Sequence, residues 1–321
     1  MSSPPDTANL AHPRYWLSWF GMGVLRLLGW MPFPFIYALS ALLGEIFYRI
    51  IPSRAHVTLV NLKLCFPEMS EKQRKRMARR HFRLLVCSLL SIGTFWWSKK
   101  PRLRRLVRIK GIEHLERAEE KGHGIIILAP HFISLDAGGL RMSIDRKMST
   151  MYQTNPNPVF DRLILQARSR FDGILIDRKA PLTRLIRSIR SGAPFYYLPD
   201  QNAGAKHGMF VPFFGVPAST FPMLGKLAQA GKAVVIPCSN RIVPWRGIET
   251  VLGAPLEDFP LGDPYEDTLR MNQEVEQMVR DLGANYLWSH KRFKRQPEGV
   301  ADLYKNTTVR LKRHSREGGN P

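Results

Sequence analysis

The sequence predicts an α/β protein with a mainly parallel sheet and helices on both faces, preceded by an N-terminal membrane-anchoring helical segment. Two observations predict this fold. From Leu106 onward, short apolar runs alternate with stretches of helical spacing, which is typical of βαβ units and a parallel sheet. Before them, residues 15–51 form a long apolar stretch rich in aromatic side chains. The 321 residues suffice for one large domain or two small ones.

The N-terminal stretch carries only three charged side chains, Arg26, Glu45 and Arg49. Two prolines interrupt it, and an arginine near the centre of a membrane span costs about 3 kcal/mol. Trp16, Trp19, Trp30 and Tyr48 are of the kind that favours the headgroup layer of a bilayer. We therefore expect residues 15–51 to anchor the chain, either by crossing the membrane or by lying in its interface. A buried helical hairpin is the alternative.

The overall composition excludes several classes of protein. Apolar residues make up 44% of the chain, too many for a disordered protein, and the mean hydropathy of −0.20 is too low for many spans. Three cysteines without a CxxC pair argue against a disulfide scaffold or a zinc cage. They fit a reducing compartment.

The charge of the chain is strongly positive, with 48 Lys and Arg against 26 Asp and Glu. Between Ser70 and Lys110 there are 14 basic residues and one acid. So uneven a distribution indicates a surface for an anionic partner, such as a nucleic acid, an anionic membrane or an acidic protein. Because basic residues follow the apolar stretch much more densely than they precede it, the main part of the chain is expected in the cytoplasm.

The expected elements follow in order along the chain. A capping box at Ser70 and Gln73 begins a helical segment that runs to about Ser98. Strands are expected at 107–110, 125–129, 149–152, 174–177, 195–198, 233–237 and 250–252. Helices are expected near 112–121, 134–144, 157–171, 180–191, 219–230 and 271–282. The predicted organisation is a tail (1–14), the anchor (15–51), a helical basic segment (52–105), the α/β domain (106–299) and a disordered basic tail (300–321).

The most informative motif is His131 followed by Asp136. His131 stands directly after the apolar run 125–129, on a strand-to-helix turn, and Asp136 falls in the first turn of the next helix. Ligand sites of parallel sheets lie beyond the carboxyl ends of the strands. On such a turn the two side chains can converge, so that Asp136 orients one ring nitrogen and the other takes a proton. A turn histidine with a purely structural role is the alternative, since His-x4-acid also occurs at His114 and Glu119.

No protein nucleophile accompanies this pair in the sequence. There is no G-x-S-x-G elbow, and no cysteine occupies a comparable turn. The nucleophile then belongs to the substrate, and the matching chemistry is acyl transfer to an alcohol whose proton His131 removes.

Several segments together resemble a known family. The His-x4-Asp block, GILIDRK (173–179) and AVVIPCS (233–239) resemble the glycerolipid acyltransferase superfamily. The segment YYLPDQNAGAKHGMFVPFFG (196–215) departs from its phospholipid branch. Together with residues 12–30, NLKLCFPEMSEKQRKRM (61–77) and YLWSHKRFKRQPEG (286–299), it is similar to the late acyltransferases of lipid A biosynthesis, the lauroyltransferase branch above all.

The resemblance implies a glycerolipid-acyltransferase-like fold and an inner-membrane enzyme whose catalytic domain faces the cytoplasm. Such an enzyme moves a fatty acyl chain, of lauroyl or myristoyl class, from acyl carrier protein to a hydroxyl of a 3-hydroxyacyl chain on a Kdo-bearing lipid A precursor. His131 and Asp136 are then the catalytic dyad. No cofactor or metal is expected. The expected partners are acyl carrier protein, the lipid A precursor and an anionic phospholipid surface, and no nucleic acid.

Further residues are assigned supporting roles. Arg178 resembles the arginine of the superfamily's second block and would hold a phosphate or the oxyanion, with a salt bridge to Asp177 or Asp200 as the alternative. Asp200 and Gln201 follow the strand at 195–198, on the same rim as His131, where they would orient Arg178 or the acceptor sugar. Candidates for docking the donor or a headgroup are Arg74, Lys75, Arg79, Arg80 and Arg292.

Two other functions remain open at this point. The nearest is a lysophospholipid or glycerolipid acyltransferase. The other, of a different class, is a membrane-tethered nucleic-acid-binding protein. Charge alone suggests the latter, since no recognition motif accompanies it.

Overall fold

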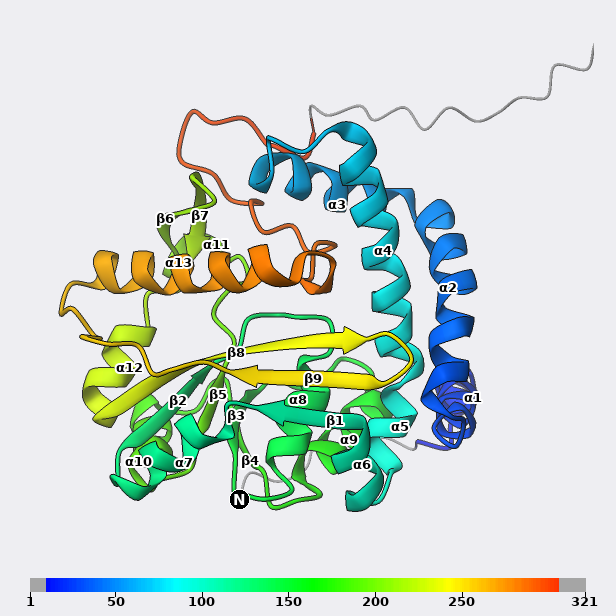
Figure 1. The fold of residues 1–321 in the computed structure, drawn as a ribbon, viewed down its shortest axis with the longest axis horizontal. Helices are drawn as coiled ribbons and strands as arrows, with labels where there is room; N and C mark the ends of the chain where they lie inside the picture. Colours follow the sequence, from blue (N-terminus) through cyan, green and yellow to red (C-terminus); the bar gives the residue numbers. More distant parts are fainter. Residues whose placement is uncertain (1–9, 306–321) are drawn as a thin grey trace, which may run out of the picture.

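The protein is described by a computed structural model that covers residues 10–305 (Figure 1). Residues 1–9 and 306–321 lie outside this range, and with them fall most of the predicted N-terminal and C-terminal tails. The centre of the molecule is a seven-stranded sheet with the order β1-β9-β8-β2-β5-β3-β4. The strands are β1 (Val107–Lys110), β2 (Gly124–Leu128), β3 (Ser149–Tyr152), β4 (Ile174–Asp177), β5 (Phe195–Tyr197), β8 (Ala233–Val243) and β9 (Gly247–Leu252).

Neighbouring strands of this sheet are parallel except β8 and β9, which form an antiparallel hairpin. The predicted α/β class with a mainly parallel sheet is therefore confirmed. Strand β2 lies in the middle and is buried along its whole length. Because side chains alternate along a strand, Ile125 and Ile127 pack on one face of the sheet, while Ile126 and Leu128 pack on the other.

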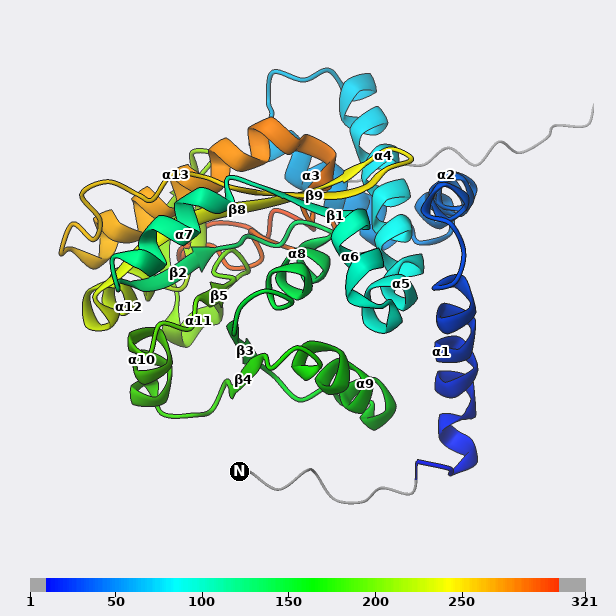
Figure 2. The same cartoon turned by 60° about the horizontal axis from the view of Figure 1, so that its bottom comes forward.

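Helices cover both faces, as expected. Helices α7 (Ile112–Glu120) and α8 (Leu135–Met142) pack on the face of Ile125, and α10 (Leu182–Arg190), α12 (Leu224–Gly231) and α13 (Pro264–Leu282) pack on the face of Ile126. Helix α9 (Pro158–Ser169) joins β3 to β4 and is set apart from α8 (Figure 2). The 3₁₀ turn η2 (Gly283–Asn285) and the one-turn helix α11 (Gly204–His207) complete this part, and a second 3₁₀ turn, η1 (Pro13–Tyr15), precedes α1 (Trp16–Leu28).

The N-terminal third is helical. It contains α1 (Trp16–Leu28), α2 (Phe33–Ile50), α3 (Pro52–Cys65), α4 (Glu71–Leu90), α5 (Ile92–Trp97) and α6 (Lys100–Leu106). The predicted capping box is present, since Ser70 accepts from the Gln73 amide and the Gln73 side chain accepts from the Ser70 amide. Helices α2 and α4 run side by side along one edge of the molecule (Figure 1).

The structure contains a pair of strands that the sequence analysis does not predict, and α13, β8 and β9 are longer than predicted. Residues 209–213 (β6) and 216–220 (β7) form a separate antiparallel hairpin. The helix expected near 219–230 accordingly begins only at Leu224. The two residues of the turn between these short strands, Phe214 and Gly215, both have positive φ, a conformation that favours a hairpin turn.

A buried histidine on α4 makes the stability of the fold sensitive to acid. His81 is fully buried, its Nδ1 lies 3.2 Å from the Ala284 carbonyl oxygen, and burial lowers its pKa from 6.5 to about 4. Between those values the unfolded chain binds the proton more readily, so the free energy of unfolding should fall by about 3 kcal/mol as the pH drops from 6.5 to 4. Denaturant titrations of the protein and of His81→Asn should show a weaker pH dependence in the variant. An unchanged slope would exclude His81 as its source.

Candidate active site

The predicted catalytic histidine lies at the carboxyl edge of the sheet, where two adjacent parallel strands end together. In the register of β2 and β5, Leu128 is paired with Tyr197. Three residues beyond Leu128 lies His131, and three residues beyond Tyr197 lies Asp200. The register alone therefore brings these two side chains to the same point of the rim.

Asp200 holds both the backbone and the ring of His131. The His131 amide lies 3.1 and 3.0 Å from the two carboxylate oxygens, and Nδ1 lies 2.7 Å from Oδ1. Since a carboxylate only accepts hydrogen bonds, Nδ1 carries the proton and donates it. The Nε2 atom is then left as the basic nitrogen of the neutral ring. His131 keeps part of its side chain exposed, whereas Asp200 is buried.

The surroundings of Asp200 keep it ionised. Burial raises the pKa of its carboxyl, but the charge and hydrogen bonds of His131 and a hydrogen bond from Tyr286 outweigh burial and lower the pKa to about 2. The guanidinium of Arg292 adds a favourable charge nearby. A permanently charged carboxylate suits a group that fixes the tautomer of an imidazole.

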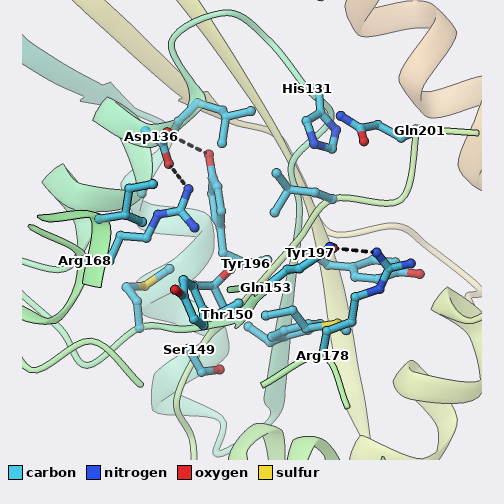
Figure 3. A pocket seen from close by; sticks show the side chains of 18 of the residues that line it. His131, Asp136, Ser149, Thr150, Gln153, Arg168, Arg178, Tyr196, Tyr197 and Gln201 are labelled. Carbon is cyan, nitrogen blue, oxygen red and sulfur yellow. Dashed lines mark hydrogen bonds and ion pairs between the residues drawn. The ribbon is translucent and has the colours of Figure 1, made fainter. Parts of the chain in front are cut away.

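Asp136 has a different partner from the one the sequence predicts. Its Oδ1 accepts a hydrogen bond from Arg168 Nη2 at 2.7 Å, and both side chains are partly exposed. Figure 3 shows Asp136 turned toward Arg168, away from the His131 ring. The expected contact between Asp136 and the imidazole is therefore wrong for this structure. The reason is that α8 begins four residues after His131 and turns Asp136 toward α9.

A cavity of about 600 Å³ opens beside His131. It occupies the place where β3 and β5 separate, because these strands pair only at Ser149–Phe195 and Thr150–Tyr196. Its size lies within the range of small-molecule sites. The apolar part of its wall comes from α8, α9 and the strand ends, and includes Leu135, Leu140, Met148, Ile164, Ala167 and Leu198.

Polar side chains gather around this cavity. Arg178, just after β4, donates to Gln153 Oε1 at 2.9 Å, and Gln201 lies beside the His131 ring (Figure 3). Arg178 thus makes neither of the salt bridges considered from the sequence. Arg168 also lines the cavity; no motif pointed to it, and only its ion pair with Asp136 across the cavity wall reveals it.

Two other supporting assignments need correction. Asp200 is buried and is engaged by His131, so it orients the imidazole and not Arg178, which bonds to Gln153. Arg292 is also buried, donates to Ser219 O and Thr220 Oγ1, and stacks on Phe213. It is therefore not a docking residue on the surface.

The other docking candidates lie on α4. Lys75 pairs with Glu71, Arg79 pairs with Glu45, and Arg74 donates to the carbonyl oxygen of Met69. Arg80 is exposed. In residues 10–305 no group of three or more His, Cys, Asp or Glu side chains could hold a metal ion.

Comparison with known proteins identifies the family of this chain. Residues 4–295 match the sequence model of a family described as bacterial lipid A biosynthesis acyltransferase. A lipid A biosynthesis lauroyltransferase of Escherichia coli (strain K12) is 34% identical over 303 residues, which cover 94% of this chain and 99% of the relative. A lipid A biosynthesis palmitoleoyltransferase from the same organism is 30% identical over 91% of this chain and 96% of the relative. A myristoyltransferase of the same pathway and organism is also 30% identical, over 94% of this chain and 94% of the relative.

The match spans nearly the whole chain and includes the α/β sheet with its histidine. The protein belongs to the bacterial lipid A biosynthesis acyltransferase family and is an O-acyltransferase. This confirms the family resemblance and the enzyme class that the sequence predicts.

Proposed function

We propose that the protein transfers a fatty acyl chain from acyl carrier protein to a hydroxyl of a 3-hydroxyacyl chain on a Kdo-bearing lipid A precursor, with His131 as the general base. The observation that carries this proposal is the His131 ring, fixed by Asp200 at Nδ1 and free at Nε2 beside a partly apolar cavity. A base so held is suited to a hydroxyl that arrives with its own lipid chain.

The transfer needs one proton to move twice. His131 Nε2 accepts the proton of the acceptor hydroxyl while its oxygen forms a bond to the thioester carbon. The tetrahedral intermediate then collapses, the carbon–sulfur bond breaks, and the imidazolium returns the proton to the leaving thiolate. Asp200 stays ionised throughout and stabilises the imidazolium, as the orienting acid does in other histidine-based transfers.

Cationic side chains near the histidine are candidates for binding negative charge. Arg178 and Arg168 both line the cavity, where a guanidinium can hold a phosphate or the oxyanion of the intermediate. We assign Asp136 the role of positioning Arg168 for this binding, since its carboxylate on α8 pairs with that guanidinium. Gln201 supplies an amide donor on the opposite side of the ring.

The acyl chain is proposed to be of lauroyl or myristoyl class and to lie in the cavity. Apolar side chains from α8 and α9 form the wall, and Met148 and Phe195 lie at the beginning of β3 and β5, away from the rim. A pocket of this kind discriminates tails by single methylenes, each worth about 1–3 kcal/mol. The relatives carry names for lauroyl, palmitoleoyl and myristoyl transfer.

A basic helix that follows Arg178 in the chain supports an acidic carrier protein as the donor. Helix α10 begins four residues after Arg178 and contains Arg184, Arg187 and Arg190 but no acid. Arg184 and Arg187 are exposed and make no ion pair with any described residue. Cations three residues apart on a helix repel one another, so an acidic partner on this face would relieve that repulsion.

Acyl transfer by the purified protein tests the proposal. With dodecanoyl-acyl carrier protein as donor, we expect acylation of a Kdo-bearing tetraacyl lipid A precursor, slower acylation of the Kdo-free precursor and none of lysophosphatidic acid. Mass spectrometry identifies the product. Transfer to lysophosphatidic acid alone would instead establish the glycerolipid function.

The same assay tests the docking helix. Arg184→Glu/Arg187→Glu should raise the KM for the carrier-bound donor about tenfold and leave the KM for dodecanoyl-coenzyme A unchanged, because only the carrier presents an acidic surface. Charge reversal at Arg76 and Arg80 on α4 is the matched control. If the α4 variant alone raised KM, the donor would dock there.

A further inference from the structure

Helix α1 is an apolar helix that the rest of the protein leaves almost uncovered. Among its thirteen residues only Met22 is buried. Leu17 is 82% exposed and Phe20 is 70% exposed, and Trp16 and Trp30 are similarly open. A contiguous apolar surface of this kind marks a site of contact with a protein or a membrane. Tryptophan at its two ends is typical of the headgroup layer.

Helix α2 continues this surface. By length and composition it is the one helix among residues 10–305 that could cross a membrane. One side of it, with Ile36 and Tyr48, is buried, while Leu42 and Ile50 on the other side are more than 60% exposed. The helix therefore has an open apolar face along its whole length.

The buried side of α2 is fixed to the charged helix α4. Gly44 lies so near α4 that an added Cβ would come within 2.5 Å of the Arg83 Cα. Glu45 pairs with both Arg79 and Arg83 of α4. If α2 crossed the bilayer, α4 would enter the hydrocarbon beside it with several exposed cations, which is strongly unfavourable.

Helix α1 is fixed to the same body. Gly93 of α5 packs directly on the carbonyl group of Leu25, and Arg102 of α6 donates to the carbonyl oxygens of Gly29 and Met31 at 2.5 and 2.7 Å. Arg26, the unexpected charge in the apolar stretch, stacks over the Trp97 ring at 5.6 Å. Because the Arg26 side chain packs on the protein in this way, it does not have to enter the membrane core.

The two helices lie along one edge of the molecule in different directions. Figure 1 shows α1 end-on and α2 from the side, and Figure 2 shows the reverse, while both keep to the same edge. Two crossed helices on one edge form a broad face. Both helices can lie on a flat membrane surface at once. They cannot both be parallel to the bilayer normal, because their axes have different directions.

We propose that α1 and α2 lie flat in the cytoplasmic leaflet of an anionic phospholipid bilayer and that neither crosses it. Their open apolar faces sink into the interface, as in other monotopic proteins. Three cations, Arg49, Arg79 and Arg83, share the single carboxylate of Glu45 at the border of this face. The excess positive charge there suits anionic headgroups.

This mode of binding also bears on how the acceptor reaches the cavity. Helix α1 contacts α9, where Asn157 donates to Ser18 Oγ at 2.9 Å. Ile164 and Ala167 on the same α9 line the cavity. An acceptor lipid in the leaflet under α1 is thus one helix away from the site. This consequence rests on the proposed function, but the mode of binding does not.

Labelling of two single cysteines decides between lying flat and crossing. The native cysteines Cys65, Cys87 and Cys238 are buried, so His12→Cys before α1 and Ser53→Cys after α2 supply the accessible thiols. In sealed inverted inner-membrane vesicles, a membrane-impermeant maleimide should modify both variants without detergent. If α2 crosses, the His12→Cys thiol becomes reactive only after the vesicles are opened, which would overturn the proposal.

Vesicle binding tests the face itself. Leu17→Asp/Phe20→Asp should reduce sedimentation with phosphatidylglycerol-containing vesicles at least tenfold, and wild type should bind phosphatidylcholine vesicles more weakly. The control is Leu261→Asp, an exposed leucine before α13, which should bind like wild type. If both variants lost vesicle binding equally, or if neither lost it, the proposal that α1 binds the membrane would be contradicted. Neither experiment depends on which acyl group or acceptor the enzyme uses.

Discussion

Replacing His131 by alanine should abolish acyl transfer, lowering kcat by about 10⁴-fold or more, while the chain still folds and binds membranes. The size of the effect follows from the proposed role. A positioned general base contributes about 10²–10⁴-fold, and its loss here also removes the acid that protonates the leaving thiolate. His131 is partly exposed at the cavity rim, so its removal leaves no unfilled core.

The chain offers a matched control for this variant. His114 and Glu119 repeat the spacing of His131 and Asp136, but they lie on α7, outside the cavity. His114→Ala should therefore retain normal turnover in the same mass-spectrometric assay. A His131→Ala enzyme with near-normal kcat would refute the role of the imidazole as base.

Asp200→Asn should lower kcat by about 10³–10⁴-fold, whereas Asp136→Asn should lower it by roughly tenfold. The Asp200 carboxylate is buried and accepts from both the backbone and Nδ1 of His131, and an amide in its place no longer enforces the Nδ1–H tautomer or stabilises the imidazolium. Asp136 pairs with Arg168 in a partly exposed position, where an ion pair contributes little. Its loss should also raise the KM for the acceptor.

The two effects are separated by steady-state kinetics on both variants, with thermal unfolding as a control for folding. Since Asp200 is buried beside Arg292, the Asp200→Asn protein should also unfold at a lower temperature, and kinetics are measured well below it. The opposite order of kcat, with Asp136→Asn the nearly inactive enzyme, would return the orienting role to Asp136.

Much of the fold could be predicted from the sequence because it depends on local patterns. The continuous apolar run before His131 is the central strand β2, and strands β1, β3 and β4 have the predicted bounds. The turn position of His131 follows from that strand, and the capping box at Ser70 follows from a four-residue pattern.

The remaining features depend on contacts between distant segments. That Asp200 partners His131 follows from the register of β2 and β5. Each of the two residues lies three positions after its strand, but the sequence shows this only to a reader who already assumes that the two strands are neighbours. The burial of Arg292 depends on how the segment after η2 packs over the β6–β7 hairpin. Within a run of basic residues, the sequence cannot distinguish a buried arginine from one at the surface.

In the proposed mechanism Asp200 fixes the His131 ring with its proton on Nδ1 and leaves Nε2 free to act as the base. Nitrogen NMR of the protein labelled at histidine, with His131→Ala used to assign the signal, measures this tautomer directly. We expect wild type and Asp136→Asn to show the Nδ1-protonated ring and Asp200→Asn to show a mixture of tautomers. A His131 signal that changes in Asp136→Asn and stays unchanged in Asp200→Asn would show that Asp136, and not Asp200, orients the ring.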